Sequence, residues 1–120
     1  MSSRILIVED EVVVAMYIET LLVTFGYEVA GIVTNGKDAI DAVKNNGIAL
    51  ILMDINIEGD IDGIETVKRI KEFSDVPVIY VSAYIDKETI DRAAETKPAS
   101  YLSKPFKNKD LKDIIDSILR

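Results

Sequence analysis

Residues 49–54 read Ala-Leu-Ile-Leu-Met-Asp, five apolar residues followed directly by an acid. A short, uninterrupted apolar run of this kind is typical of a strand buried on both faces, as in parallel sheets covered by helices. Residues 5–8 and 76–81 have nearly the same character, and shorter or weaker runs lie at residues 29–33 and at Tyr101-Leu102. The sequence therefore predicts several strands of one buried sheet.

Stretches with helical spacing lie between these runs. In each of them, apolar residues recur three or four positions apart, as they do along one face of a helix. These residues are Ala15, Ile18, Leu22 and Phe25; Ala39 and Val43; Ile64, Val67 and Ile70; Ile90, Ala93 and Ala94; and Leu111, Ile114, Ile115, Ile118 and Leu119. Five strand–helix pairs in strict alternation predict an α/β fold, (βα)5, in which helices cover both faces of an open, doubly wound parallel sheet.

The composition fits a single folded domain over residues 1–120. The 21 acids outnumber the 14 bases, for a net charge of −7, so we expect no direct binding to nucleic acid. The chain has no Cys and no His, which excludes disulfides, thiol nucleophiles, imidazole bases and the usual zinc sites. Its chemistry must therefore use carboxylates, hydroxyls, amines and the backbone.

Nothing in the sequence indicates a membrane segment or a signal peptide. The first apolar run, residues 5–8, is short and is followed by three acids, and the longest apolar runs are far below the roughly 20 residues that span a bilayer. We therefore expect a cytoplasmic protein without membrane contact.

Polar side chains stand at the carboxyl ends of the predicted strands, where open α/β sheets bind ligands. Glu9 and Asp10 follow the first strand, Asp54 the third, Ser82 the fourth, and Lys104 comes shortly after the fifth. If the first and third strands are neighbours, Glu9, Asp10 and Asp54 converge. Two carboxylates about 4 Å apart repel by roughly 4 kcal/mol at an effective dielectric of 20, so such a cluster favours a bound cation. An all-oxygen donor set with two or three carboxylates suits Mg²⁺ that shares a phosphate ligand. This points to phosphoryl chemistry, in which an aspartate can accept the transferred group.

Five markers in order resemble the receiver domain of bacterial and archaeal response regulators, the CheY-like domain of two-component signalling. They are Leu6-Ile-Val-Glu-Asp-Glu11, Asp54, Asp62-Gly63, Ser82-Ala83 and Tyr101-Leu-Ser-Lys-Pro-Phe106. The resemblance covers the whole chain and implies a flavodoxin-like strand order, 2-1-3-4-5. It also implies a signalling domain that catalyses only its own phosphorylation and dephosphorylation.

The resemblance assigns the acidic residues to one site. Asp54 would be the phosphoacceptor, and Asp10 would bind Mg²⁺ (or Mn²⁺) directly. Glu9 would assist through water, and the backbone carbonyl of Asn56 would be a further ligand. The phosphoryl group would come from the phosphohistidine of a sensor histidine kinase or phosphotransfer protein, because a chain without His cannot supply its own.

Further residues are implied to respond to phosphorylation. Lys104 would pair with the phosphoryl group, Ser82 would hydrogen-bond to it, and Tyr101 would change rotamer. The Lys104-Pro105 bond is expected to be cis, as is usual in this family. The face made by the fourth helix, fifth strand and fifth helix would then present a changed surface to a downstream protein or a fused output domain.

Some features depart from the family pattern. Lys97-Pro98-Ala99 stands where Gly-Ala is usual, so the turn before the fifth strand is expected to be rigid and to lack a left-handed glycine. The Met-Pro that usually follows the phosphoacceptor is missing, and the loop from Asp54 to Gly63 is one residue longer than common.

Asn56 lies two residues past the phosphoacceptor, and Tyr84 lies two residues past Ser82. These two residues are predicted to gate the hydrolytic water.

Several alternatives remain at this point. Residues 54–65 nearly match an EF-hand calcium loop, although an EF-hand needs a preceding helix where this sequence predicts a strand. A haloacid-dehalogenase-type phosphatase usually needs a second aspartate where Asn56 stands, and a flavin phosphate would be repelled by residues 9–11. A receiver-like module that only binds proteins and is not phosphorylated is the remaining alternative.

Overall fold

A computed structural model gives the structure of the chain over residues 3–83 and 86–120. The strands are β1 (Arg4–Val8), β2 (Glu28–Val33), β3 (Leu50–Met53), β4 (Val78–Ser82) and β5 (Ser100–Ser103). The helices are α1 (Val12–Thr24), α2 (Gly36–Asn45), α3 (Gly63–Ile70), α4 (Lys87–Glu95) and α5 (Asn108–Leu119). Tyr84, one of the two predicted gate residues, lies outside the described residues.

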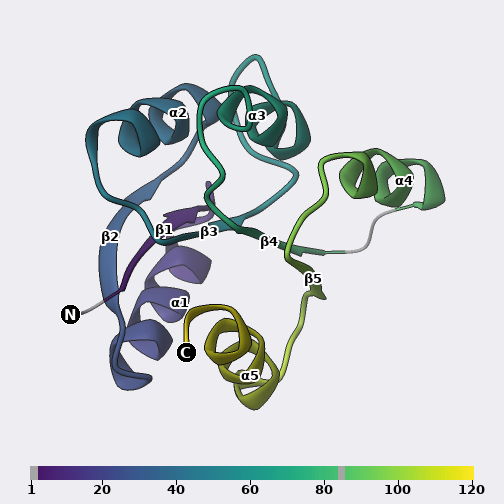
Figure 1. Ribbon diagram of the computed structural model, residues 1–120. Helices are drawn as coiled ribbons and strands as arrows, with labels where there is room; N and C mark the ends of the chain where they lie inside the picture. Colours follow the sequence, from purple (N-terminus) through teal and green to yellow (C-terminus); the bar gives the residue numbers. More distant parts are fainter. Residues whose placement is uncertain (1–2, 84–85) are drawn as a thin grey trace.

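The strands form one parallel sheet in the order β2-β1-β3-β4-β5 (Figure 1). The predicted fold class and strand order are thereby confirmed. The order in which strands are added reverses between β1 and β3, because β2 lies on one side of β1 and β3 on the other. β1 and β3 are hydrogen-bonded neighbours, with Val8 opposite Met53. In sheets of this kind that reversal opens a crevice beyond the carboxyl ends of the strands.

Two hydrophobic cores lie on opposite faces of the sheet, because side chains alternate between the faces along each strand. Ile5 and Ile7 pack with α1 and α5, whereas Leu6 and Val8 pack with α2, α3 and α4. Figure 1 shows the corresponding layers, with α1 and α5 on one side of the sheet and α2 and α3 on the other. Each central strand is therefore buried on both faces, which explains its continuous apolar run.

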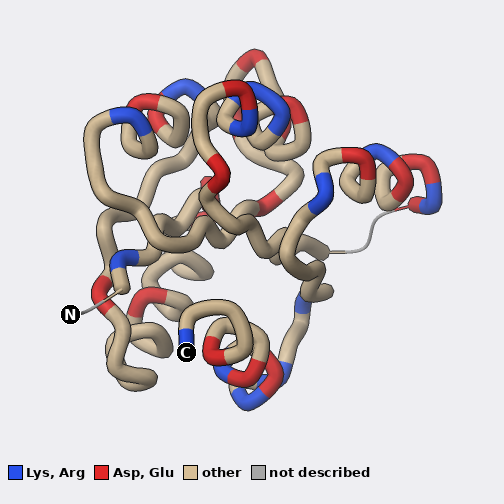
Figure 2. Tube along the Cα trace, viewed as in Figure 1, with Lys and Arg blue, Asp and Glu red and all other residues tan. Residues whose placement is uncertain are grey.

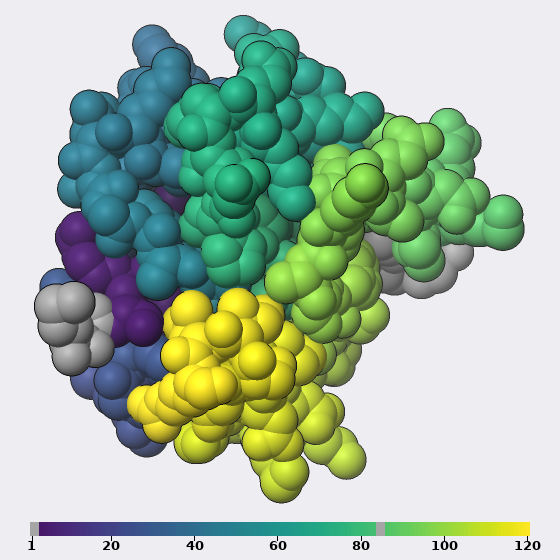
Figure 3. Space-filling view, viewed as in Figure 1, coloured from purple at the N-terminus to yellow at the C-terminus, as the bar shows by residue number. Residues whose placement is uncertain are grey.

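Helix α4 differs from the apolar pattern that predicts it. Ala93 is buried, but Ile90 has 48% of its surface exposed, and Ala94 is also exposed. The helix stands out at one edge of the molecule in Figures 1 and 3, so little of its apolar stripe is covered. The stripe correctly indicates a helix but overstates its burial.

The strand and turn boundaries also differ in detail from the apolar runs. β4 begins at Val78, after Pro77, and extends to Ser82, which pairs with Ser103 at the end of β5. In the turn before β5, Lys97 adopts a left-handed backbone conformation with φ of 52°. The turn thus lacks a glycine, as expected, but a lysine takes the left-handed conformation in its place.

Helix ends near the crevice are capped by side chains that the sequence places there. Asn35 accepts a hydrogen bond from the backbone N–H of Asp38 at the start of α2, and Asp62 accepts one from Glu65 at the start of α3. Such caps satisfy N–H groups that have no partner within the helix. No helix in the described part of the chain is long and apolar enough to cross a membrane.

Candidate functional site

Three carboxylates meet at the carboxyl ends of β1 and β3. Each of Glu9, Asp10 and Asp54 places one carboxylate oxygen within 4.8 Å of the others. The strand register explains this, since Glu9 and Asp10 follow Val8, Asp54 follows Met53, and Val8 is paired with Met53. Glu9 and Asp54 are buried, with 2% and 7% of their surface exposed. The residues predicted to share a site are therefore close together.

The donor set fits a hard divalent cation. All three side chains offer oxygen, and carboxylates this close together are stabilised by a nearby positive charge. Mg²⁺ is commonly bound by one or two carboxylates together with waters and phosphate oxygens. Burial raises the pKa of Glu9, while the hydrogen bond with Lys104 acts in the opposite direction.

Lys104 reaches this cluster from the end of β5. Its ammonium group forms ion pairs with Glu9 and with Asp54, the latter at 3.2 Å between Nζ and Oδ2. Burial by itself would lower the pKa of Lys104, but the hydrogen bond with Glu9 and the charge of Asp54 outweigh it, so the pKa is raised. Lys104 thus remains a cation beside the carboxylates, and its peptide bond to Pro105 is cis.

The other oxygen of Asp54 is held by two donors. The hydroxyl of Ser82 donates to Oδ1 at 3.1 Å, and the backbone N–H of Asn56 donates to the same atom at 3.2 Å. Together with Lys104 on Oδ2, these contacts fix the orientation of the carboxylate. A carboxylate held rigidly with its charge neutralised from one side can serve as an oriented nucleophile.

Tyr101 lies next to this group with its hydroxyl unsatisfied. The hydroxyl oxygen is buried and has no hydrogen-bond partner among the described residues. The ring lies 6.4 Å from that of Tyr80, measured between centroids. Burial raises the pKa of the Tyr101 hydroxyl, the charge of Asp54 raises it further, and the neighbouring Ser82 hydroxyl acts in the opposite direction. Tyr101 therefore borders the contact between Ser82 and Asp54.

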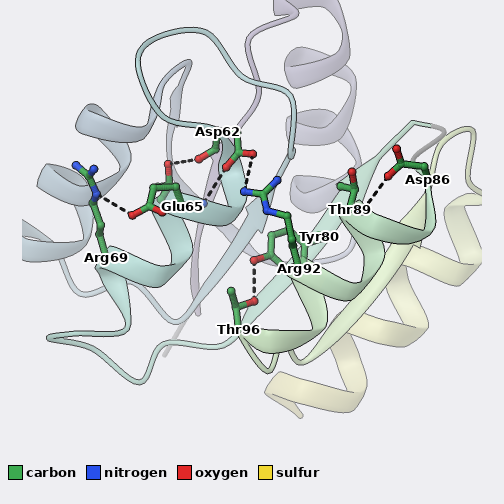
Figure 4. Close-up of polar contacts among 9 residues, drawn as sticks. Asp62, Glu65, Arg69, Tyr80, Asp86, Thr89, Arg92 and Thr96 are labelled. Atoms are coloured by element: carbon green, nitrogen blue, oxygen red, sulfur yellow. Dashed lines mark hydrogen bonds and ion pairs between the residues drawn. The ribbon is translucent and has the colours of Figure 1, made fainter.

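The EF-hand-like reading of residues 54–65 finds no support in the fold. Strand β3, and not a helix, precedes this loop. Glu65, which would be the last calcium ligand, belongs to α3 and pairs with Arg69 at 3.2 Å. Its backbone N–H is bound by Asp62, as Figure 4 shows. Asp54 therefore belongs to the acidic cluster, and Glu65 belongs to α3, instead of both binding one calcium ion.

The sequence did not reveal how the loop after Asp54 is held. Glu58 accepts a hydrogen bond from Thr34 at 2.6 Å, and Asp62 forms an ion pair with Arg92 of α4 at 3.2 Å (Figure 4). The spacing of Asp62 and Glu65, three residues apart before an apolar stripe, is a signal from which the α3 cap could have been predicted. No comparable signal marks Thr34 or Arg92.

Comparisons with known proteins agree with this geometry. The family model described as "Response regulator receiver domain" matches residues 5–116. The chain is 32% identical over 120 residues to the chemotaxis protein CheY of Treponema pallidum, covering 98% of this chain and 83% of that protein. It is 30% identical over 108 residues to the transcriptional regulatory protein PdtaR of Mycobacterium tuberculosis, covering 90% of this chain and 52% of the relative.

A solved structure extends the comparison to the site. The receiver domain of the Pseudomonas aeruginosa sensor histidine kinase PA1611, described with a magnesium ion coordinated in its active-site cleft, superposes with a TM-score of 0.89. The two are 28% identical, and the match covers 99% of this chain and 98% of that one. The chain spans about half the length, or less, of several curated relatives that it matches. From its fold, its acidic site and the family match, the chain belongs to the response regulator receiver domains.

Proposed function

We propose that this domain accepts a phosphoryl group onto Asp54 from the phosphohistidine of a partner histidine kinase or phosphotransfer protein. The observation that carries the proposal is the setting of Asp54. It is a buried carboxylate beside two other acids, with one oxygen paired to Lys104 and the other held by Ser82 and Asn56. Receiver domains are signalling domains, and this setting supports phosphorylation as the signal.

The proposed transfer forms one bond and breaks one. A carboxylate oxygen of Asp54 attacks the phosphorus, the phosphorus–nitrogen bond to the donor imidazole breaks, and the imidazole leaves with a proton. The product is an acyl phosphate on Asp54. Lys104 lies within contact distance of the carboxylate and would offset the charge brought by the phosphoryl oxygens.

Glu9, Asp10, Asp54 and the backbone carbonyl of Asn56 are the residues that we expect to hold the metal. The grouping of the three carboxylates supports this assignment, as does their all-oxygen chemistry. When bound, Mg²⁺ (or Mn²⁺) would neutralise negative charge on the phosphoryl group during transfer. The residues themselves orient the acceptor and exclude bulk water, as the burial of Glu9 and Asp54 indicates.

Ser82 and Tyr101 are the residues that we propose as the switch. In the structure described, the Ser82 hydroxyl is directed at Asp54, where it would meet a phosphoryl oxygen. If Ser82 shifts to that oxygen, the neighbouring Tyr101 can repack beside it. The change would reach the face formed by α4, β5 and α5, so that a downstream protein or fused output domain distinguishes the two states.

Helix α1 presents an exposed apolar surface beside the site. It begins directly after the acidic segment, and Glu19 is its one charged residue (Figure 2). Its outward side chains include Val13 and Met16, which have 81% and 56% of their surface exposed. An apolar surface of this kind on a monomer is typical of an interaction site. We propose that the phosphodonor docks there, which would place its histidine near Asp54.

Intact-mass spectrometry tests the proposed function. The chain is incubated with Mg²⁺ and acetyl phosphate or phosphoramidate, and Asp54→Asn is treated in parallel. We expect one phosphoryl addition to the unmodified chain, none without Mg²⁺, and none to Asp54→Asn. The matched control is Asp60→Asn, an exposed acid in the same loop, which should be phosphorylated normally.

Two results would contradict the proposal. Phosphoryl addition that persists in Asp54→Asn would move the acceptor elsewhere. A folded chain that gains no phosphoryl group under any of these conditions would favour the alternative of a receiver-like module that binds proteins without being phosphorylated.

A further inference from the structure

The loop after the acceptor is closed at its base by the backbone. The N–H of Gly63 donates to the carbonyl of Ile55 at 2.7 Å, so residues 56–62 project as a closed loop. Gly63 leaves no room for a side chain, since an added Cβ would lie 2.1 Å from the carbonyl oxygen of Asp54. The position of the loop base is therefore set, and the position of its tip depends on other contacts.

The tip is joined on one side to the segment that follows β2. The Thr34 hydroxyl donates to Glu58 Oε1 at 2.6 Å, and Asn35 and Glu58 form an isolated parallel bridge. One side chain and one stretch of backbone thus hold the same residue. Glu58 lies two residues beyond Asn56, whose N–H donates to Asp54 Oδ1 at 3.2 Å, so contacts at both ends of this short segment bear on the position of the Asn56 carbonyl.

The segment that carries Thr34 is itself well anchored. Asn35 caps α2 by accepting from the N–H of Asp38 at 2.9 Å. At Gly36 an added Cβ would lie 2.2 Å from Thr66 Oγ1 and 2.7 Å from Ile61, so the start of α2 packs directly against α3 and the loop. Thr34 therefore offers a fixed point from which the loop can be positioned.

The loop is also held from the opposite side, but farther from Asn56. Asp62, which caps α3, pairs with Arg92 of α4 at 3.2 Å, as Figure 4 shows. This contact is partly buried, whereas the Thr34–Glu58 contact is exposed, but it joins the loop only where α3 begins. Loss of the Arg92 contact would leave both the Asp62 cap and the Glu58 contact in place. It is therefore a matched comparison for the Thr34 contact.

We propose that Thr34 is a positioning residue for the metal site: by holding Glu58, it sets the position of the Asn56 carbonyl. The inference rests on the proposed function, in which that carbonyl is a metal ligand. Thr34 touches neither the metal nor the phosphoryl group in this scheme. It acts through Glu58, as residues behind metal ligands commonly do when they fix the ligand that the ion requires.

Magnesium titration of three variants tests this role. Thr34→Val keeps the side-chain shape but removes the donor, Thr34→Ser restores a hydroxyl, and Arg92→Gln releases the other side of the loop. Each is titrated with MgCl₂ by isothermal titration calorimetry, and the amide shifts of Asn56 and Glu58 are followed by NMR. Thermal unfolding in EDTA checks that every variant is folded.

We expect Thr34→Val to raise the Mg²⁺ dissociation constant about three- to tenfold, less than the roughly 10- to 100-fold typical of groups that contact a metal ligand directly. Thr34→Ser and Arg92→Gln should stay within about twofold of the unmodified chain, because both keep a hydroxyl that can bind Glu58. The Asn56 amide should shift in Thr34→Val before Mg²⁺ is added.

Two outcomes would overturn the inference while leaving the proposed function intact. In the first, Thr34→Val binds Mg²⁺ as tightly as the unmodified chain, which is still phosphorylated. In the second, Arg92→Gln weakens binding as much as Thr34→Val, so that any loosening of the loop suffices. If the unmodified chain itself binds no Mg²⁺, the inference and the metal-dependent function fail together.

Discussion

The three crowded carboxylates lead to a prediction about stability. Replacing Asp54 with asparagine should stabilise the metal-free domain, because it removes a charge from the cluster. At separations of up to 4.8 Å, Glu9 and Asp10 each repel Asp54 by about 3.5 kcal/mol or more at an effective dielectric of 20. Lys104 at 3.2 Å attracts it by about 5 kcal/mol on the same scale.

The balance is a net gain for the variant. The repulsions exceed the attraction by about 2 kcal/mol, and solvent around the partly exposed Asp10 reduces this to about 1–2 kcal/mol. The hydrogen bonds from Ser82 and from the Asn56 N–H can be kept, because an asparagine carbonyl oxygen accepts both. We therefore expect asparagine at this position to raise the free energy of unfolding.

Urea unfolding followed by circular dichroism measures the effect. In EDTA, Asp54→Asn should unfold at a higher urea concentration than the unmodified chain, with an unchanged slope. At a Mg²⁺ concentration roughly ten times its dissociation constant, the unmodified chain should gain about 1.4 kcal/mol, and the variant should gain less. The control, Asp60→Asn, changes an exposed acid outside the cluster and should differ by no more than about 0.5 kcal/mol.

The electrostatic reasoning would be refuted if Asp54→Asn were less stable than the unmodified chain in EDTA. That result would mean that the contact with Lys104 outweighs the repulsion between the acids. An equal gain from Mg²⁺ in both proteins would show that Asp54 does not contribute to metal binding.

The other predictions concern buried groups around the site. Burial raises the pKa of Tyr80 to about 12, so the neutral hydroxyl stabilises the fold fully below about pH 10, and up to about 2.7 kcal/mol is lost as the pH rises through 12. Tyr80→Phe should lose about 1 kcal/mol near neutral pH, since the hydroxyl bonds Thr96. In urea unfolding at several pH values, the free energy of unfolding of Tyr80→Phe should fall less above pH 10 than that of the unmodified chain. An equal fall in both proteins would contradict this. Gly63→Ala should lower the free energy of unfolding by about 2–3 kcal/mol, because its Cβ would lie 2.1 Å from the Asp54 carbonyl oxygen. Gly47→Ala, which has no atom within 4 Å of its Cβ, should change it by about 0.5 kcal/mol or less, and equal losses would contradict the packing argument.

The sequence was most informative where burial is continuous. All four residues of β3 are buried, and an uninterrupted apolar run predicts that environment directly. The prediction was weaker for α4, where Ile90 belongs to an apolar stripe but is largely exposed. Periodicity shows which face of a helix could be covered, whereas the neighbours that cover it are known only once the chain is folded.

The acidic cluster could also be predicted from the sequence, for a physical reason. Parallel strands end at the same edge of a sheet, so acids that directly follow two neighbouring strands must lie close together. Glu9 and Asp54 meet in this way because Val8 is paired with Met53. The sequence by itself therefore determined the buried sheet and the edge at which the site lies, and the resemblance to receiver domains supplied the strand order that brings these carboxylates together.

Only the tertiary structure decided how the loop after Asp54 is held. Thr34 meets Glu58 and Arg92 meets Asp62 across 24 and 30 residues of sequence. Contacts of this kind join loops and helix surfaces that have no repeating pattern, so nothing local predicts which side chains will meet. They depend on how α2, α3 and α4 pack around the sheet, because that packing alone brings the two sides of the loop within hydrogen-bonding distance of their partners.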